Sequence, residues 1–349
     1  MSTDHDDTEM LCERVQDAAA GKTPLVIRAG DSKSFYGRTV QGKPLTLTSH
    51  RGILSYRASE LVITARCGTR IADIEAALDE HGQQLAFEPP RHSAQSTIGG
   101  AVACGLSGPS RPFYGAARDF VLGAKIINGK GELMQFGGQV MKNVAGYDLS
   151  RLMVGAQGTL GVILEVSIKV LPKSEAETTL VYEIEAAAGH QKLRDWLGRG
   201  LPISASCHYQ GLLTVRLNST ENSIRDSRTA MGGEETDSDI WQQLRDQTHP
   251  GFHRKNLWRL SLPPAAPIDN EDDQLIEWAG ALRWQTSDNE LFDKASGLGG
   301  HATRYTLGSD TSAEVFQPLS SGMLAIHNRI RQALDPDHIL NPGRLYQEL

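Results

Sequence analysis

The chain has 349 residues, which is enough for about two domains of ordinary size. Hydrophobic residues make up 39% and charged residues 22%, so the composition is that of a folded protein and not of a disordered one. The formal net charge is −7. An acidic balance argues against nucleic acid as the main partner, since binding to phosphates needs a basic surface.

Targeting and membrane signals are not found. In the glycine-rich region, the longest stretch without Asp, Glu, Lys or Arg is 92–110, which is rich in Ser and Gly and not in side chains that favour lipid. Four of the first nine residues are acidic, whereas secretory signals begin with basic residues and mitochondrial signals are poor in acids. We therefore expect a cytoplasmic location.

Cysteine spacing and nucleotide motifs exclude several kinds of site. The four cysteines (Cys12, Cys67, Cys104 and Cys207) form no Cys-x-x-Cys pair, so we expect neither an iron–sulfur cluster nor a four-cysteine zinc site. The sequence also contains no Gly-x-Gly-x-x-Gly and no Gly-x4-Gly-Lys-Ser/Thr. A Rossmann site and a P-loop are therefore not expected, and a bound dinucleotide would need another main-chain device.

The first elements follow one another closely. We expect a helix over 10–20, capped by Thr8, and then strands over 25–28, 45–48, 53–57 and 61–66. Thr69 suits the N-cap of the next helix, which Gly82 is expected to close. The apolar face of that helix carries Ile71, Ile74, Ala77 and Leu78.

Glycine is concentrated in residues 99–161, which hold 14 of the 35 glycines. Such density indicates either a flexible linker or a main chain that approaches another group closely. The linker alternative fails because strands over 120–127 and 132–136 flank an Asn-Gly-Lys-Gly hairpin pattern, and 162–170 alternates between apolar and polar residues. We therefore expect these glycines to serve a ligand or tight turns.

The second half begins after Pro172, where polar residues predict a domain boundary, so that 1–173 and 174–349 form two domains. Strands are expected over 180–184, 212–217 and 258–262. Residues 219–239 are polar and predict a loop or an exposed helix. A last amphipathic helix, ended by Asp335-Pro336, has an apolar face of Met323, Ile326, Ile330 and Leu334.

Three glycine-bearing segments are candidates for binding a ligand. In the first, a strand runs into Arg28-Ala29-Gly30-Asp31-Ser32, where several amides can turn toward an anion; the alternative is an ordinary turn. The second offers adjacent glycines for a close main-chain approach and hydroxyls for phosphate oxygens; the alternative is a small-residue helix packed on a sheet. Its candidate residues are Ser96, Thr97, Ile98, Gly99, Gly100, Gly105, Tyr114, Gly115 and Asp119.

The third segment leads through a glycine loop into the alternating strand. Amides over 158–161 suit the edge of a heterocycle or a ribose; the alternative is a tight connection between helix and strand. Its candidate residues are Lys142, Tyr147, Gly158, Thr159, Gly161, Val162 and Ile163. Each segment alone is open to its alternative, but their combination and order are specific.

Together the segments resemble the FAD-binding domain of the vanillyl-alcohol oxidase / p-cresol methylhydroxylase (PCMH) family, over approximately 20–173. Within that family, residues 105–109, 137–148 and the tail 341–345 are similar to FAD-binding subunits of bacterial glycolate oxidases. The resemblance implies an α+β fold, with a two-lobed PCMH-type FAD-binding domain followed by a short α+β cap domain whose last segment can return to the first. It places 28–32 and 96–100 along the pyrophosphate and 158–163 against the flavin or its nucleotide.

Departures from the family pattern limit what carries over. Members that attach FAD covalently have a His where this sequence has Ser32, which implies a non-covalent FAD. The His-x-Gly-Asp-Gly-Asn-x-His motif of hydroxy-acid oxidases is not found, and the Pro and Gly between His249 and His253 do not suit a metal pair. We assign no metal site and no catalytic residue. The candidates for holding an anionic substrate, with surface cations as the alternative, are Arg216, Arg259 and Arg304.

The resemblance implies an FAD-dependent oxidoreductase that acts on CH–OH groups, as a subunit of a glycolate oxidase complex that oxidises glycolate, a small 2-hydroxy acid, to glyoxylate. The implied partners are a homologous FAD-containing catalytic subunit and an iron–sulfur subunit, with indirect contact to the inner membrane through the complex. Two alternatives stay open. One is a self-sufficient FAD-dependent 2-hydroxy-acid dehydrogenase, and the other is a non-catalytic structural subunit.

Overall fold

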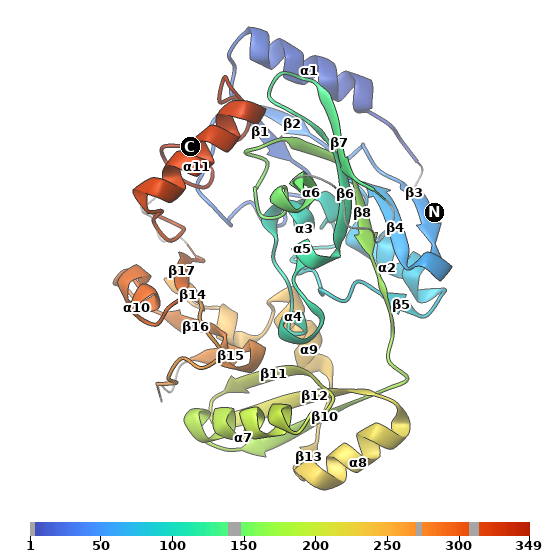
Figure 1. The fold of residues 1–349 in the computed structure, drawn as a ribbon, viewed down its shortest axis with the longest axis vertical. Helices are drawn as coiled ribbons and strands as arrows, with labels where there is room; N and C mark the ends of the chain where they lie inside the picture. Colours follow the sequence, from blue (N-terminus) through green and yellow to red (C-terminus); the bar gives the residue numbers. More distant parts are fainter. Residues whose placement is uncertain (1–3, 139–147, 270–273, 307–313) are drawn as a thin grey trace.

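The computed structural model describes the chain except for residues 1–3, 139–147, 270–273 and 307–313. Its strands form two large, separate sheets and two small ones, and helices lie around them (Figure 1). The five-stranded sheet is built from residues before 173 and the eight-stranded sheet from residues after it. The expected α+β fold class is confirmed.

The five-stranded sheet is antiparallel and has the order β3-β4-β8-β6-β7. Its strands are β3 (Ile53–Arg57), β4 (Val62–Arg66), β6 (Val121–Ile127), β7 (Leu133–Gly137) and β8 (Val162–Lys169). β8 occupies the centre because its side chains are buried on both faces, except for the half-buried Glu165 and Lys169. The expected hairpin is β6–β7, where the Asn128 side chain accepts hydrogen bonds from the amides of Lys130 and Glu132.

Short elements surround this sheet. They are α1 (Thr8–Ala20), η1 (Ala58–Glu60), α2 (Ile71–Asp79), α3 (Ile98–Cys104), α4 (Arg111–Tyr114), α5 (Ala117–Phe120) and α6 (Leu149–Leu152). Two strand pairs complete it: the parallel pair β1 (Leu25–Arg28) and β2 (Lys43–Thr46), and the antiparallel pair β5 (Gln83–Gln84) and β9 (Leu171–Pro172). One continuous apolar core joins α1, α2 and α3 to the sheet.

Both expected helix caps are wrong. α1 begins one residue earlier than a Thr8 cap allows: Asp7 holds the N-cap position, and the amide of Thr8 donates to the Asp6 carboxylate. α2 has Arg70 at its N-cap, because the hydroxyl of Thr69 instead accepts from the amide of Gly52. The Thr69 hydroxyl is thus held by a contact with Gly52 that local spacing does not reveal.

The eight-stranded sheet has the order β13-β10-β12-β11-β15-β16-β14-β17. Its strands are β10 (Ala176–Glu183), β11 (Ile203–Tyr209), β12 (Leu212–Ser219), β13 (Glu234–Glu235), β14 (Leu257–Ser261), β15 (Leu275–Glu277), β16 (Leu282–Thr286) and β17 (His301–Arg304). The accompanying helices are α7 (Ala186–Gly198), α8 (Glu221–Met231), α9 (Asp239–Asp246), η2 (Pro250–Phe252), η3 (Trp278–Gly280) and α10 (Phe292–Gly297). We call this sheet and its helices the cap.

The end of the chain lies beside the first sheet. After β17, α11 (Ser321–Leu334) leads back to the first half, where the amide of Leu25 at the start of β1 donates to the carbonyl of Ile339 and Leu334, Ile339 and Leu340 belong to the core (Figure 1). The expected apolar face of this helix is wrong at its N-terminal end: Met323 is 45% and Ile326 49% exposed. Only the C-terminal turns of α11 reach that core, so the earlier turns have no apolar surface to cover them in the described part of the chain.

Candidate functional site

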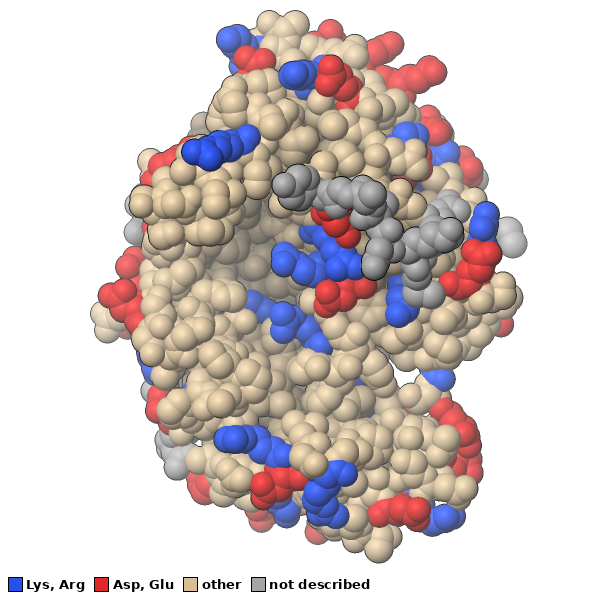
Figure 2. Space-filling view, viewed as in Figure 1, with Lys and Arg blue, Asp and Glu red and all other residues tan. Residues whose placement is uncertain are grey.

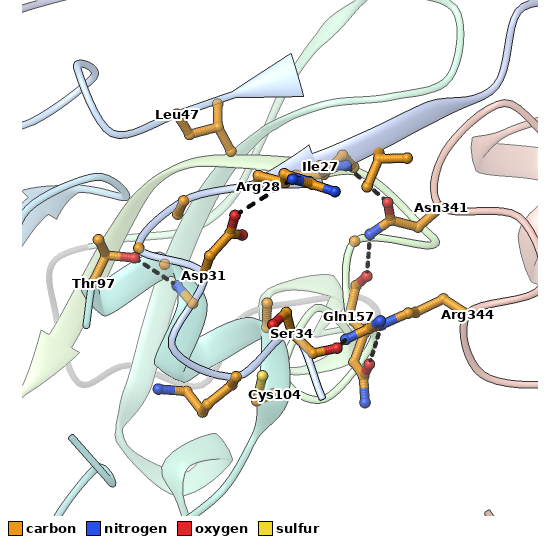
Figure 3. A pocket seen from close by; sticks show the side chains of 18 of the residues that line it. Ile27, Arg28, Asp31, Ser34, Leu47, Thr97, Cys104, Gln157, Asn341 and Arg344 are labelled. Carbon is orange, nitrogen blue, oxygen red and sulfur yellow. Dashed lines mark hydrogen bonds and ion pairs between the residues drawn. The ribbon is translucent and has the colours of Figure 1, made fainter. Parts of the chain in front are cut away.

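A cavity of about 490 Å³ lies in the first half, within the size range of small-molecule and cofactor sites (Figure 3). The three glycine-bearing segments contribute to its wall, together with residues from the end of the chain. Eleven of the residues predicted to bind a ligand line it: Arg28, Ala29, Gly30, Asp31, Ser32, Thr97, Gly99, Gly100, Gly158, Gly161 and Ile163.

The loop after β1 offers main-chain donors to this cavity. Asp31 has a left-handed φ of 49°, and its carboxylate lies 3.7 Å from the Arg28 guanidinium. Within the described chain, no hydrogen bond is found for the amides of residues 29–33, whereas the next amide, of Ser34, donates to the carbonyl of Asp31. Successive unpaired amides at such a turn are typical of an anion site.

Close contact between two loops fixes this segment. A Cβ on Gly30 would lie 1.8 Å from the carbonyl oxygen of Gln95, so only glycine lets the two main chains approach each other here. Ser96 reinforces the contact, since its hydroxyl donates a 2.8 Å hydrogen bond to the Ser32 hydroxyl. Ser96 therefore holds the loop of residues 29–33, which we call the anion loop, on the side away from the cavity, and does not itself line the cavity.

The second segment forms the start of α3, but its amides are already paired. Those of Ile98 and Gly99 donate to the carbonyls of Thr69 and Cys67, and that of Gly100 donates to the Thr97 hydroxyl. A Cβ on Gly99 would lie 2.4 Å from Cys67 Cβ, whereas one on Gly100 would meet only the Thr97 hydroxyl, at 3.2 Å. Gly99 thus serves the packing of the helix on β4 and its loop, and Gly100 leaves room at the cavity.

The third segment contributes the glycine loop before β8. Gly158 has a φ of +75°, and its amide has no hydrogen bond in the described structure. A Cβ on Gly161 would lie 2.7 Å from Ile126 Cδ1 and 3.3 Å from the Ile127 carbonyl oxygen, so a larger residue here would push the Ile126 side chain on the neighbouring strand out of place. The segment therefore combines a tight connection with a stretch of main chain that faces the cavity.

Eight other predicted residues lie outside the cavity wall and have roles within the protein. Ile98 and Val162 are core residues, Gly105 caps α3 with a φ of +65°, and Thr159 donates to the carbonyl of Ala156. The other four are Ser96, Tyr114, Gly115 and Asp119; the last accepts from the amide of Ala116 at the start of α5. Lys142 and Tyr147 lie outside the described residues.

Sequence reasoning missed the wall that the C-terminal segment builds. Asn341 accepts a 2.8 Å hydrogen bond from the amide of Ile27, and Arg344 donates to the Gln157 side chain at 2.9 Å (Figure 3). Arg344 also donates to the carbonyls of Ser34, Tyr36 and Arg38. The tail motif was visible in the sequence, but no local pattern connects it to residues more than 180 positions away.

A second missed residue, Lys33, places a buried cation in the wall. Its side chain is 6% exposed, and the ammonium group donates to the carbonyl of Pro90 at 3.2 Å. Burial lowers the pKa of Lys33. The pKa of His92 is lowered to about 4, first because His92 is itself buried and second because the positive charge of Lys33 opposes its protonation. The two cysteines of the wall are thiols of raised pKa, in the case of Cys67 to about 12, because burial disfavours the thiolate.

The three candidate arginines of the cap have different surroundings. Arg216 is buried and paired with Glu88 at 2.8 Å, and Arg304 stacks on the indole of Trp258. Arg259 lies over the faces of Trp278 and Trp284 and has no carboxylate within salt-bridge distance in the described chain. Arg304 likewise has no carboxylate within that distance in the described chain, but it stacks on Trp258, which faces the other side of the sheet from Arg259. Of the three, Arg259 is therefore the one on the side of Trp284 without an acidic partner.

Neither a membrane-spanning helix nor a metal-binding cluster is found among the described residues. No helix among them combines the length and the apolar character needed to cross a bilayer. They also contain no group of three or more His, Cys, Asp or Glu side chains arranged to hold a metal ion. His249 accepts a hydrogen bond from the amide of Gly251 through Nδ1 and stacks edge-on against Tyr209, so it has a structural role.

Comparison with known proteins agrees with this geometry. Residues 5–137 match the FAD binding domain family. The chain is 48% identical to the glycolate oxidase subunit GlcE of Escherichia coli (strain K12), over 99% of both chains. It is 37% identical to the glycolate oxidase subunit GlcD of Bacillus subtilis (strain 168), over 48% of this chain and 36% of GlcD.

The fold is shared with more distant proteins. A solved structure of alkyldihydroxyacetonephosphate synthase matches with a TM-score of 0.66 at 14% identity, covering 97% of this chain and 75% of that one. The family match and the relatives define the class, which is that of FAD-dependent oxidoreductases, and the shared fold is that of a PCMH-type FAD-binding domain. Within that class, the chain belongs to the family of the glycolate oxidase subunit GlcE.

Proposed function

We propose that this chain is the FAD-holding GlcE-type subunit of a glycolate oxidase complex that oxidises glycolate to glyoxylate. The observation that carries the proposal is the cavity itself: about 490 Å³, walled by three glycine-bearing segments, with unpaired amides at 29–33. These features fit a dinucleotide, because its pyrophosphate needs donors and its ring system needs close main-chain approach. The 48% identity to a glycolate oxidase subunit over the full length supports the same conclusion.

In this proposal, two regions of the cavity wall hold different parts of the cofactor. The amides of 29–33 hold the pyrophosphate, and Thr97 and Gly100 line the path beside it. The segment from Gly158 to Ile163 and the C-terminal residues Asn341 and Arg344 form the opposite wall. Bound FAD supplies the capacity to take two electrons from a CH–OH group.

We propose that FAD is held without a covalent bond. No histidine lines the cavity in the described part of the chain, and Ser32 stands where covalent members of the family have one. The thiols in the wall, Cys67 and Cys104, are poor nucleophiles because burial raises their pKa. Precipitation of the purified protein with acid tests this: FAD should appear in the supernatant, and flavin retained in the pellet would contradict it.

The electrons must leave this chain through partners. The sequence contains no Cys-x-x-Cys pair to hold a cluster, so we propose an iron–sulfur subunit as acceptor and a homologous FAD-containing catalytic subunit beside it. The chain would work in the cytoplasm and reach the inner membrane only through the complex. We also propose that the FAD domain ends near 173, where one sheet ends and the next begins, with the tail returning to it.

Glycolate-dependent reduction of an artificial dye distinguishes this proposal from its alternatives. A subunit of a complex should turn over glycolate when it is purified with its partners and lose that activity when it is removed from them. Equal turnover by the chain alone would identify a self-sufficient dehydrogenase. A chain that assembles but neither holds FAD nor affects turnover would be a structural subunit.

A further inference from the structure

Two arginines outside the cavity lack an acidic partner. Arg111 begins α4 in the first half, Arg259 lies in β14 of the cap, and both side chains are half-buried. In the described structure, neither guanidinium has a hydrogen bond or an ion pair within 4.0 Å, and each instead lies over an aromatic ring. Half-buried arginines without an acceptor are unusual, because their donors lose water without replacement.

A single tryptophan supports both guanidinium groups. The central carbon of Arg111 lies 4.5 Å from the ring centroid of Trp278, and that of Arg259 lies 5.1 Å from it. Trp278 is 2% exposed and anchored, because its indole N–H donates to the carbonyl of Gly108 at 2.9 Å. Stacking on a fixed ring holds the arginines in place and leaves the N–H edges of both guanidinium groups free for a ligand.

The register of the cap sheet shows which face is involved. Arg259 lies opposite Trp284 on one side and Thr303 on the other, and Ser261 lies opposite His301. Since paired residues share a face, Arg259, Trp284 and His301 project from the same side of the sheet. Because Arg111 comes from α4, the site lies between the first half and the cap. Figure 2 shows a hollow at the centre of one face of the molecule, with Lys and Arg side chains in it and some Asp and Glu side chains beside them.

The local charge is positive. Burial lowers the pKa of Arg111, and the neighbouring charge of Arg259 lowers it further, as expected for two cations with no anion between them. Glu277 acts on Arg259 from β15, but burial raises its pKa to about 7, and it accepts a hydrogen bond from Trp284. The charge of Asp119, more than 4.0 Å away, raises the pKa of Arg111, and the charge of Arg118 lowers it.

We propose that Arg111 and Arg259 together bind the carboxylate group of a small organic acid above the indole of Trp278. A carboxylate fits because it is planar and its two oxygens can accept from both guanidinium groups. A series of aromatic contacts connects the site to the cavity: the ring centroid of Phe35, at the cavity wall, lies 5.4 Å from that of Tyr305, which lies 4.8 Å from that of Trp284, the second ring under Arg259. That the acid is the 2-hydroxy acid to be oxidised rests on the proposed function.

Binding of oxalate and glycolate to the full-length chain tests the site, with calorimetry as the readout and FAD content measured in the same samples. Glycolamide, which has the shape of glycolate without its charge, is the ligand control. Arg111→Gln and Arg259→Gln should each weaken oxalate binding about tenfold or more, since a charge-assisted pair is lost. Arg304→Gln is the matched control, because Arg304 stacks on Trp258, which faces the other side of the same sheet. It should bind oxalate as the wild type does.

Lysine variants keep the test valid if a glutamine variant is unstable. Arg111→Lys and Arg259→Lys retain the charge but lose the planar pair of donors, so they should bind oxalate less tightly than the wild type and reject glycolamide. Unchanged oxalate affinity in all four variants, or no binding by a wild-type chain that holds FAD, would overturn the site. Loss of FAD alone, with oxalate still bound, would contradict the proposed function and not this site. The free chain and the assembled complex should both bind oxalate. If only the free chain binds it, an acidic side chain of a partner subunit occupies the site in the complex, and the proposal of a small organic acid as ligand would be overturned.

Discussion

Asn341 joins two cavity walls that are far apart in the sequence: its side-chain Nδ2 donates a 2.7 Å hydrogen bond to the main-chain oxygen of Gln157. The same amide accepts from the main-chain N–H of Ile27 at 2.8 Å, so one side chain links β1, the glycine loop before β8 and the tail. The cavity is therefore closed by the end of the chain and not by the first half alone.

We predict that removing this link loosens the cavity without unfolding the protein. Asn341→Gly should lower the free energy of unfolding by about 1–3 kcal/mol, because the buried groups of Ile27 and Gln157 lose their partner. Glycine is the right replacement since Asn341 has a φ of 41°, which would strain alanine. Thermal unfolding and the rate of FAD release measure the effect. Asn256→Gly, at another residue of positive φ whose side chain bonds only an exposed Asp288, is the control. If the two variants release FAD equally fast, the link is not what holds the cavity.

Arg344 is expected to order the segment after the anion loop. Its guanidinium donates to the carbonyls of Ser34, Tyr36 and Arg38, so Arg344→Gln should speed amide hydrogen exchange over residues 34–38. Arg329→Gln removes an exposed arginine of α11 and should leave that exchange unchanged. Equal protection of 34–38 in both variants would show that the clamp is not needed.

The two adjacent glycines of α3 are expected to behave differently. Gly100→Val should fill cavity space and reduce FAD content while the fold persists, since a Cβ there meets only the Thr97 hydroxyl. Gly99→Val should instead destabilise the protein, because its Cβ would overlap Cys67. FAD content and the unfolding midpoint, measured on both variants, separate the two effects. Full FAD occupancy in a folded Gly100→Val protein would refute the placement of the cofactor along α3.

Glu277 is expected to make stability fall as pH rises. Its folded pKa of about 7 is above the usual 4.5, so the folded chain keeps a proton that the unfolded chain releases. The stabilising contribution is therefore full below pH 4.5 and is lost as pH rises through 7, by about 3 kcal/mol.

Urea unfolding across that pH range, on the wild type and on Glu277→Gln, measures this effect. Glutamine keeps the acceptor for the Trp284 indole and carries no charge, so the variant should gain stability relative to the wild type as pH rises. Glu290→Gln, at an exposed position, should follow the wild type. Parallel curves for Glu277→Gln and the wild type would show that Glu277 is already ionised in the fold.

Local patterns predicted much of the first half. β1 and β3 have the expected limits, and the alternation of 162–170 identified β8, because a buried strand must carry apolar residues at regular spacing. Residues of all three predicted glycine-bearing segments also line one cavity in the structure. Their individual roles were not readable, since Gly99 and Gly161 serve contacts with Cys67 and Ile126 that exist only after folding.

What sequence reasoning missed depends on long-range contacts. The roles of Asn341 and Arg344 follow from the return of the tail to the first half, and local periodicity carries no information on such a return. Arg111 was not predicted as a binding residue because its partner in the proposed site, Arg259, is 148 positions away and in the other half of the chain. The expected face of α11 was wrong for a related reason: spacing gives the amphipathic pattern but not what covers it.

The central claim is that the main chain of the first half holds FAD in the cavity. The visible absorption spectrum of the purified full-length chain tests it most directly, followed by measurement of the flavin released on heat denaturation. We expect flavin bands in the native protein and about one FAD per chain in the released fraction, in line with the cavity of cofactor size in the first half. A spectrum without flavin bands, both as purified and after incubation with excess FAD, would contradict the account.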